Sequence, residues 1–313
     1  MKTDFSFFMA LASIGLVSIG PASIGLATMA PGTAQAADIE LRYLCYSDAN
    51  ECAVSRDLLD RFEEDNPSIH VEIDEVDYPI ILNQLPRELA QENGPDIARV
   101  TDLGGLNEYY LDIAPFVDRA YWEDNFGPML DWMRAGPEDD GIYGWLTQLT
   151  VSGPYANKTM FDEAGVALPA EGASWDDWAD ATRRVQDTLG VYAAMVMDRS
   201  GHRFAGVAIS MGAGYFDPSG QPAIVDEGFK AMAQMMVDWH DQGLMPEDVW
   251  PAMPGSGWKN GADMFMDGDA VLHLSGSWMI QRYAVEIGNN FEWIAVPQPC
   301  GAVSCSGMPG GAA

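Results

Sequence analysis

Positive charge is what this sequence has least of. Its 313 residues include 16 Lys and Arg against 47 Asp and Glu, a formal net charge of −31 at pH 7. Contacts with nucleic-acid phosphates need clustered cations, so nucleic acid is not expected as a partner. The excess of acids predicts a solvated surface suited to salty water, or alternatively a field that attracts a cationic ligand.

Motifs of common enzyme classes are also missing. The sequence has no dinucleotide fingerprint, no HExxH, no Gly-x-Ser-x-Gly and no evident pair of catalytic carboxylates. Its four histidines are scattered, at positions 70, 202, 240 and 273. We therefore expect no catalytic residue, no metal and no cofactor. An exported glycosidase stays the enzymatic alternative, because two suitably spaced acids are enough for that chemistry.

An uninterrupted apolar run long enough to span a membrane is lacking as well. The segment Phe5–Gly20 is apolar and follows Lys2, but Gly and Pro interrupt it. Ala34-Gln35-Ala36 has the small-x-small pattern of a cleavage site. We therefore predict a signal peptide over residues 1–36, cleaved near Ala36 on export. No cysteine follows the apolar segment directly, so a lipid anchor is not expected.

Cysteine is scarce, and its four positions form two close pairs. They are Cys45, Cys52, Cys300 and Cys305. Their spacings are too wide for the usual CxxC redox motif, and export implies an oxidising compartment. Local disulfides Cys45–Cys52 and Cys300–Cys305 are the simplest interpretation. Zinc is the alternative, although no histidine lies nearby to complete a site.

The first part of the mature chain alternates strand and helix patterns. Strands are predicted at Ile39–Leu44, 69–73 and 96–100, with helices between them; the second of these, over 80–92, is expected to break or kink at Pro86. This order favours a parallel sheet, in which ligands bind beyond the carboxyl ends of the strands. Here those ends carry Tyr46-Ser47-Asp48 and Thr101-Asp102.

A second α/β series follows residue 144. Ser174 and Asp177 predict a capped helix that continues to about Leu189. Further helices are expected at 226–242, 258–266 and 278–287, and strands at 191–197, 270–274 and 291–296. The only connection between the two series is the short segment 143–150. Two α/β lobes joined by short strands are therefore expected.

Several stretches, in a specific order over residues 41–311, resemble one family. They are LLDRFEEDNP (58–67), NGPDI (93–97), GIYG (141–144), GPYANKTMFDEAGV (153–166), SWDDW (174–178), MFMDG (264–268) and GSW (276–278). Each is weak alone. Together they are similar to the extracellular (periplasmic) solute-binding proteins of ABC sugar importers, related to maltose-binding protein.

The resemblance implies a two-lobed periplasmic-binding-protein fold (type II) with a hinge that closes on the solute. The first lobe is expected at 37–143, with 306–313 returning to it, and the second at 144–305. Family members usually continue past the Pro-Gly-Gly found here at 309–311 with several more helices. Those C-terminal helices are expected to be missing from this chain.

The resemblance also implies a function without catalysis. The protein would be a periplasmic monomer that captures a mono- or oligosaccharide and delivers it to the membrane subunits of an ABC permease. A glycerol phosphodiester or a polyamine is the alternative solute. An anionic solute would need Arg or Lys in the cleft, and none follows the strand ends considered above.

Four ligand-binding residues are predicted from the resemblance. Trp278, on the Gly-Ser-Trp turn, would stack on the apolar face of a sugar; its alternative role is core packing. Asp48 and Asp102, each just past a strand, would accept hydrogen bonds from hydroxyls; the alternatives are a helix cap or a solvated loop acid. Tyr155 is the fourth, one residue out of register with the family's tyrosine.

Overall fold

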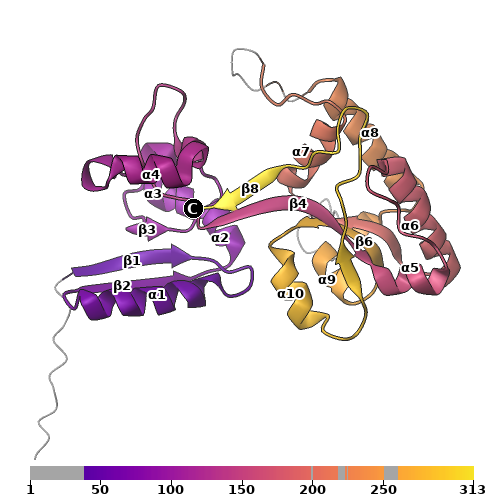
Figure 1. The fold of residues 1–313 in the computed structure, drawn as a ribbon, viewed down its shortest axis with the longest axis horizontal. Helices are drawn as coiled ribbons and strands as arrows, with labels where there is room; N and C mark the ends of the chain where they lie inside the picture. The colour runs from indigo at the N-terminus through magenta and orange to yellow at the C-terminus, as the bar shows by residue number, and fades with distance from the viewer. Residues whose placement is uncertain (1–38, 199, 218–222, 224, 250–259) are drawn as a thin grey trace, which may run out of the picture. The chain divides into compact units, whose positions relative to one another are not determined.

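The computed structural model describes residues 39–198, 200–217, 223, 225–249 and 260–313. Within these ranges the chain forms two α/β lobes, each with its own sheet (Figure 1). The predicted signal peptide lies outside the described residues, as do the first two residues of the helix predicted at 258–266. Among the described helices, none is both long and apolar enough to cross a membrane.

The first sheet has three parallel strands in the order β2-β1-β3. β1 (Ile39–Cys45) pairs along its whole length with β2 (Ile69–Glu75), whereas β3 (Ile97–Ala98) is shorter than predicted. Parallel neighbours need a crossover, and α1 (Glu51–Asp65) is the first. The predicted parallel arrangement of this sheet is therefore confirmed.

The second crossover is broken at Gln84, two residues before the predicted position at Pro86. α2 (Tyr78–Asn83) ends before Gln84, and α3 (Leu85–Ala90) begins directly after it. Pro86 is the second residue of the new helix, where its missing N–H costs nothing because the first N–H groups of a helix have no partner. A proline therefore marks a helix start here rather than a kink.

The remainder of the first lobe consists of short helices. After the 3-10 turns Asn107–Tyr109 and Ala114–Phe116 comes α4 (Arg119–Phe126), followed by a 3-10 helix at Gly127–Met133. The Asp118 side chain accepts hydrogen bonds from the first N–H groups of α4. Leu44, Ile81 and Val100 form the centre of the core beneath them, and Tyr46 and Leu85 belong to the same cluster.

The second sheet is mixed, with the order β5-β6-β4-β7. β5 (Ala193–Met197) runs parallel to β6 (Ala270–Gly276). β4 (Gln148–Asn157) is antiparallel to both β6 and β7 (Trp293–Ala295). Every residue of β5 and β6 is buried, as expected for apolar strands that are covered on both faces.

Helices cover this sheet. They are α5 (Lys158–Ala164), α6 (Trp175–Leu189), α7 (Gly201–Ser210), α8 (Glu227–Asp241), α9 (Gly261–Met266) and α10 (Met279–Glu286), with a 3-10 turn at Glu247–Val249. The predicted capping box starts α6: Asp177 N donates to Ser174 Oγ at 3.1 Å, and Ser174 N donates to Asp177 Oδ2 at 2.8 Å. Trp175, Trp178 and Trp239 lie in the core, as predicted.

Two strands join the lobes, as expected, although their bounds were not predicted. The first half of β4, Gln148–Val151, is antiparallel to β8 (Pro309–Ala312), and its second half belongs to the second sheet (Figure 1). Ala313 exchanges two backbone hydrogen bonds with Val100 of the first lobe, at 2.9 and 3.0 Å. Because these strands contact both lobes, the boundaries at residues 143 and 306 stay a prediction.

Candidate functional site

A cavity of about 740 Å³ opens between residues of the two lobes and of the joining strands. The first lobe contributes Tyr46, Ser47, Asp48, Tyr78 and Thr101. The joining strands contribute Gln148, Thr150, Gly310 and Gly311, and the second lobe contributes Met197, Asp198, Ser200, His202, Arg203, Val249, Asn260, Gly261, Ala262, Trp278, Met279 and Arg282. This volume lies in the usual range for a small-molecule site.

The first-lobe wall begins where β1 ends. Tyr46-Ser47-Asp48 turns away from the sheet, and the disulfide between Cys45 and Cys52 closes the loop onto α1. Glu51 Oε2 accepts hydrogen bonds from the backbone N–H groups of Asp48 and Ala49, both at 3.0 Å. These hydrogen bonds hold the backbone of the loop. They do not involve the side chain of Asp48.

Arg99 lies beneath this loop and is almost completely buried. Its Nη1 donates to Tyr46 O at 2.7 Å, and its Nη2 donates to Gln148 Oε1 at 2.6 Å. The guanidinium carbon lies 3.9 Å from the centroid of the Tyr46 ring. Nη2 is also 3.9 Å from carboxylate oxygens of both Asp48 and Glu51. One buried cation thus connects the loop, the two acids and β4.

Asp48 presents an acceptor that is open to the cavity. Burial raises the pKa of its carboxyl group, Arg99 and Arg203 oppose the shift, and Glu51 adds to it. None of the described residues donates a hydrogen bond to the Asp48 carboxylate, and Arg99 lies beyond hydrogen-bonding distance at 3.9 Å. A partly buried acceptor without a donor is suited to hydroxyl groups of a ligand.

The second-lobe wall contains Asp198, an acid whose two carboxylate oxygens both have hydrogen-bonding partners. Asp198 Oδ1 lies 2.8 Å from His273 Nε2, and Asp198 Oδ2 accepts from Ser275 Oγ at 2.5 Å. Arg203 Nε is 3.6 Å from Asp198 Oδ2. Burial pushes the pKa of Asp198 upward, but His273, Arg203 and the Ser275 hydroxyl together lower it to about 2. The opposite ring nitrogen of His273 contacts the buried Tyr283 hydroxyl.

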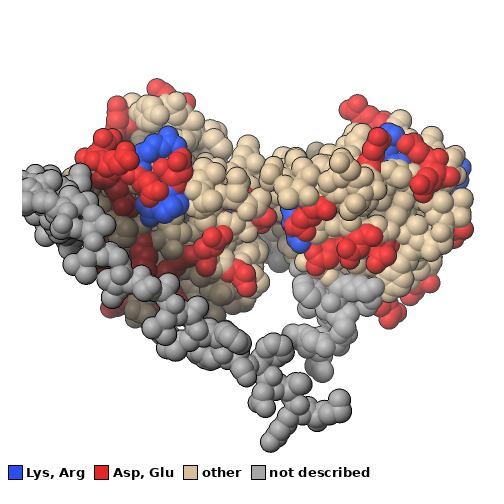
Figure 2. All heavy atoms as spheres, turned by 90° about the horizontal axis from the view of Figure 1, so that it is seen from below, with Lys and Arg blue, Asp and Glu red and all other residues tan. Residues whose placement is uncertain are grey.

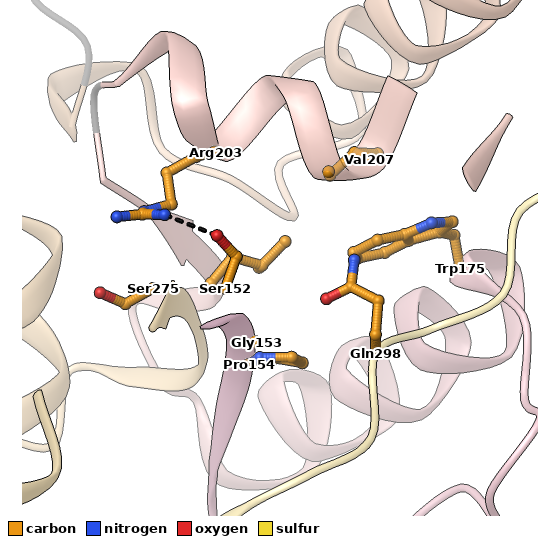
Figure 3. Close-up of a pocket in the computed structure, with 10 residues that line it drawn as sticks. Ser152, Gly153, Pro154, Trp175, Arg203, Val207, Ser275 and Gln298 are labelled. Atoms are coloured by element: carbon orange, nitrogen blue, oxygen red, sulfur yellow. Dashed lines mark hydrogen bonds between the residues drawn. The ribbon is translucent and has the colours of Figure 1, made fainter. Parts of the chain in front are cut away.

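Arg203 and Trp278 form one unit in this wall. The guanidinium carbon of Arg203 lies 3.9 Å from the Trp278 ring centroid, and Nη1 donates to Ser152 Oγ at 2.8 Å. Figure 3 shows the latter contact beside a second cavity of only about 10 Å³, which Trp175 and Gln298 line from the other side. Trp278 also packs against Gly276, where a Cβ atom would clash with the indole. Arg203 therefore covers part of the indole surface.

The structure brings two of the four predicted ligand residues to the cavity. Asp48 and Trp278 line it, whereas Asp102 and Tyr155 are not among the described lining residues. Asp102 is an exposed loop acid whose Oδ1 accepts from Gly105 N at 3.2 Å, while its neighbour Thr101 lines the cavity. The side chain at the end of β3 that faces the cavity is therefore one residue earlier than predicted.

Tyr155 is a core residue in this structure. Its side chain is buried against Tyr283 and Trp293, and its hydroxyl donates to Gly276 O at 2.7 Å. Residues of a strand point alternately to its two faces, so an offset of one residue from the family pattern exchanges a cavity position for a core position. The prediction of a ligand contact at Tyr155 has no support from this placement.

Several cavity residues were missed. Tyr78 is exposed in the cavity wall, with its hydroxyl 2.8 Å from Thr101 Oγ1 and its ring 4.9 Å from that of Tyr46. Asp198 follows the carboxyl end of β5, so the rule that was applied to β1 and β3 would have found it. No Arg or Lys follows the strand ends considered in the sequence, but Arg203 and Arg282, from α7 and α10, both line the cavity.

Charge is nevertheless balanced along the cavity wall. Arg282 donates to Glu286 Oε1 at 2.8 Å and to Asp263 Oδ1 at 2.9 Å, so its charge is offset by two acids. Other Asp and Glu side chains are spread over the surface (Figure 2). The described residues contain no group of three or more His, Cys, Asp or Glu placed to hold a metal ion. The site is therefore one of hydrogen-bonding groups and aromatic rings.

Comparison with solved structures identifies the architecture. The GacH receptor of Streptomyces glaucescens, solved unliganded and with acarbose, superposes with a TM-score of 0.72 at 17% identity, over 88% of this chain and 70% of that one. Maltose-bound MalE3 of T. maritima gives 0.70 at 17% identity, over 88% and 71%. The maltotriose-binding protein of Thermus thermophilus gives 0.66 at 15% identity, over 87% and 71%. These TM-scores establish a shared two-lobed fold. At such low sequence identities the likeness concerns the fold alone.

The family follows from the sequence itself. The model of the bacterial extracellular solute-binding proteins matches residues 57–312, which include the second part of α1, strands β2 and β3 of the first sheet, the whole second sheet and the joining strands. That span also contains most of the residues that line the cavity between the lobes. This chain is a member of the bacterial extracellular solute-binding protein family.

Proposed function

We propose that this protein captures a neutral mono- or oligosaccharide and delivers it to the permease of an ABC importer. The observation that carries the proposal is the pairing, in one cavity of about 740 Å³, of the open Asp48 carboxylate with the aromatic rings of Tyr78 and Trp278. Three proteins of the same fold were solved with acarbose, maltose or maltotriose, which supports a saccharide as the ligand.

The two kinds of group match the two parts of a sugar. A pyranose has faces of C–H groups, which flat aromatic rings cover at little cost in side-chain entropy. Its rim of hydroxyls needs partners, since an unpaired buried hydroxyl costs about 1–3 kcal/mol. Asp48, Thr101 and Gln148 supply oxygen acceptors at the cavity wall. Tyr78 thereby replaces Tyr155 in the set of ligand residues that we propose.

A charged solute is less well matched. Arg203 would favour an anion such as a phosphodiester, but Asp198 lies 3.6 Å from its Nε and offsets its charge. Arg282 is paired with two acids of its own. A polyamine would need several acids without partners. Asp198 is already bonded to His273 and Ser275 of its own lobe, so Asp48 is the one aspartate among the described lining residues that could pair with an amine. A ligand without net charge fits this balance.

Catalysis is not part of the proposal. A glycosidase needs one carboxylic acid that is protonated at working pH and a second carboxylate. Asp198 cannot serve as the acid, because its partners lower its pKa to about 2. The description of the family names solute binding, which supports the proposal.

Binding would be accompanied by closure of the two lobes about β4 and β8, with lobe boundaries near residues 143 and 306. β8 has four residues and pairs only with the first half of β4, residues 148–151, so bending there would change the cavity without disrupting either sheet. The N-terminal 36 residues would direct export to the periplasm and be removed there. The mature protein would act as a monomer that docks on the permease.

The proposal is tested by titrating the mature protein with a panel of neutral saccharides in a calorimeter. Micromolar or tighter binding of at least one sugar is expected, with a change in tryptophan fluorescence from Trp278. The sugar recovered afterwards should be chemically unchanged. Binding of only phosphodiesters or polyamines would contradict the proposal, and hydrolysis of the sugar would contradict its non-catalytic part.

A further inference from the structure

Three consecutive cavity residues lie within a loop that a disulfide closes. Cys45 and Cys52 are bonded at a sequence separation of 7, and Tyr46, Ser47 and Asp48 lie between them. The second disulfide, Cys300–Cys305, has the similar separation of 5. No residue from 299 to 306 is among the described residues that line the large cavity. The chain thus contains a disulfide at the site and a matched one away from it.

We propose that the Cys45–Cys52 disulfide is a positioning element of the ligand site, which holds Asp48 in its ligand-receiving place and thereby raises affinity. This inference rests on the proposed function, because it concerns the same cavity. The Cys300–Cys305 disulfide, although of similar length, contributes to folding without affecting the ligand. Residues 45–52 are called the Asp48 loop below.

The Asp48 loop has no regular secondary structure to hold it. Residues 46–50 belong to no helix or strand, and Asn50, the residue before α1, makes no capping hydrogen bond with its side chain. Besides the disulfide, three groups hold the loop. Arg99 donates to Tyr46 O at 2.7 Å, the Glu51 carboxylate accepts from two backbone N–H groups, and Ser47 Oγ accepts from Cys52 N at 3.1 Å. An unclosed loop would sample other conformations, and a ligand would have to bear the entropy of ordering it.

The disulfide is well placed for a permanent restraint. Cys45 is 0% and Cys52 is 2% exposed, so solvent reductants have little access to them. Cys305 is exposed, and thiols would attack it first. The disulfide at the site must therefore be removed by substitution, because a reductant would open Cys300–Cys305 before it reached Cys45–Cys52.

The closed loop also fixes the position of the Asp48 carboxylate relative to the charged groups around it. Arg99 lies beneath it and Arg203 faces it from the second lobe, while Glu51 is the neighbouring acid. In the closed loop, burial raises the pKa of the Asp48 carboxyl group. A released loop would move Asp48 toward water, so its pKa would return toward the value of an exposed aspartate. The position of Asp48 can therefore be followed without any ligand.

The experiment compares C45A/C52A with C300A/C305A. In calorimetry with the saccharide that wild type binds best, C45A/C52A should raise Kd about tenfold, judged from the cost of ordering a loop on binding. C300A/C305A should leave Kd within about twofold, because no side chain between its cysteines lines the cavity. Equal increases in Kd for the two variants would overturn the proposal.

Two readouts on the ligand-free protein separate this inference from the proposed function. Amide hydrogen exchange at residues 46–49 should become faster in C45A/C52A alone, and the NMR-measured pKa of Asp48 should fall in that variant alone. Unchanged exchange and pKa would overturn the positioning role. If wild type bound no saccharide, the proposed function would fail, while these two measurements would still decide the role of the disulfide.

A gentler pair of variants covers the case in which C45A/C52A does not fold. Ala49→Gly loosens the Asp48 loop, and Ala302→Gly loosens the other disulfide loop, at exposed positions with both disulfides intact. Ala49→Gly should raise Kd about twofold and accelerate exchange at residues 46–49, because glycine adds backbone freedom. The same response to Ala302→Gly would contradict the proposal.

Discussion

Asp48 and Asp198 are two aspartates at the wall of the same cavity, one from each lobe, and the structure treats them in opposite ways. Burial raises the pKa of Asp48, and no described residue donates a hydrogen bond to its carboxylate. Asp198 has partners on both carboxylate oxygens, and its pKa is lowered to about 2. Both residues are aspartates that line one cavity. Only Asp48 has carboxylate oxygens that accept no hydrogen bond from a described residue.

The difference assigns separate tasks to the two lobes. In the first lobe, restraints act on the backbone of the Asp48 loop and leave the carboxylate free. In the second lobe, side chains restrain one another, so Asp198 orders Arg203, His273 and Ser275 instead of meeting a ligand. We expect ligand affinity to depend on the first acid and folding stability on the second.

The largest expected effect is on stability. Asp198→Ala should lower the free energy of unfolding by about 3–5 kcal/mol, because it leaves Arg203 buried without its counter-charge and His273 without its acceptor. Urea denaturation measures the change. Asp124→Ala, at an exposed acid of α4, is the control and should change stability by less than about 0.5 kcal/mol. Equal losses for the two variants would remove the structural role of Asp198.

Asp48→Asn should act on binding instead. It should weaken saccharide affinity by about 1.5–3 kcal/mol, or roughly 10- to 150-fold, which is what hydrogen bonds to a charged acceptor contribute. Unfolding free energy should stay the same or rise slightly, since a partly buried charge is removed. Calorimetry and urea denaturation on one preparation give both values. A stable variant with wild-type affinity would show that Asp48 does not contact the ligand.

Trp278→Ala tests the second lobe's direct contribution to the ligand. Affinity should fall by about 1–3 kcal/mol, the worth of an aromatic stacking platform in other recognition sites. The loss of stability should be smaller than the roughly 3–5 kcal/mol expected for Trp178→Ala, which empties a buried core position. Comparing the melting temperatures of both variants with their affinities decides between cavity and core. If Trp278→Ala kept wild-type affinity, the indole would serve to pack against Arg203 and would not contact the ligand.

The smallest effect concerns a residue first predicted to touch the ligand. Tyr155→Phe removes the hydroxyl that donates to Gly276 O, so stability should fall by about 1 kcal/mol. Affinity should not change, because the ring stays in the core against Tyr283 and Trp293. A clear loss of affinity at unchanged stability would return Tyr155 to the ligand site.

Local chemistry explains which features of the fold were predictable. Alternation in residues 69–73, the Ser174–Asp177 capping box and the two close cysteine pairs are each decided by neighbours in sequence, and the structure contains all of them. Short joining strands were expected, but the bounds of β8 were not predicted, because the glycine-rich segment 309–312 has little strand propensity until β4 pairs with it.

The candidate site was predictable where strand order or the family resemblance indicated it. Asp48 follows a predicted parallel strand, where the resemblance also implies a ligand residue, and Trp278 was predicted from the resemblance alone. Arg203 lies three residues into α7 and reaches the cavity because the helix places it across from Asp198 and Trp278. The positions of these residues in the sequence do not indicate that they come together in the fold. Tyr155 shows the reverse case, in which a shift of one residue moves a side chain from cavity to core.

The most direct test follows both carboxyl groups by NMR while pH is varied, with and without bound saccharide. Without ligand, Asp48 should titrate above the ordinary aspartate value and Asp198 near pH 2. Hydroxyl donors favour the charged carboxylate, so binding should lower the pKa of Asp48, and affinity should rise with pH through its ligand-free pKa. Asp198 should not change. A ligand-induced shift at Asp198 with none at Asp48 would contradict the division of tasks between the two acids.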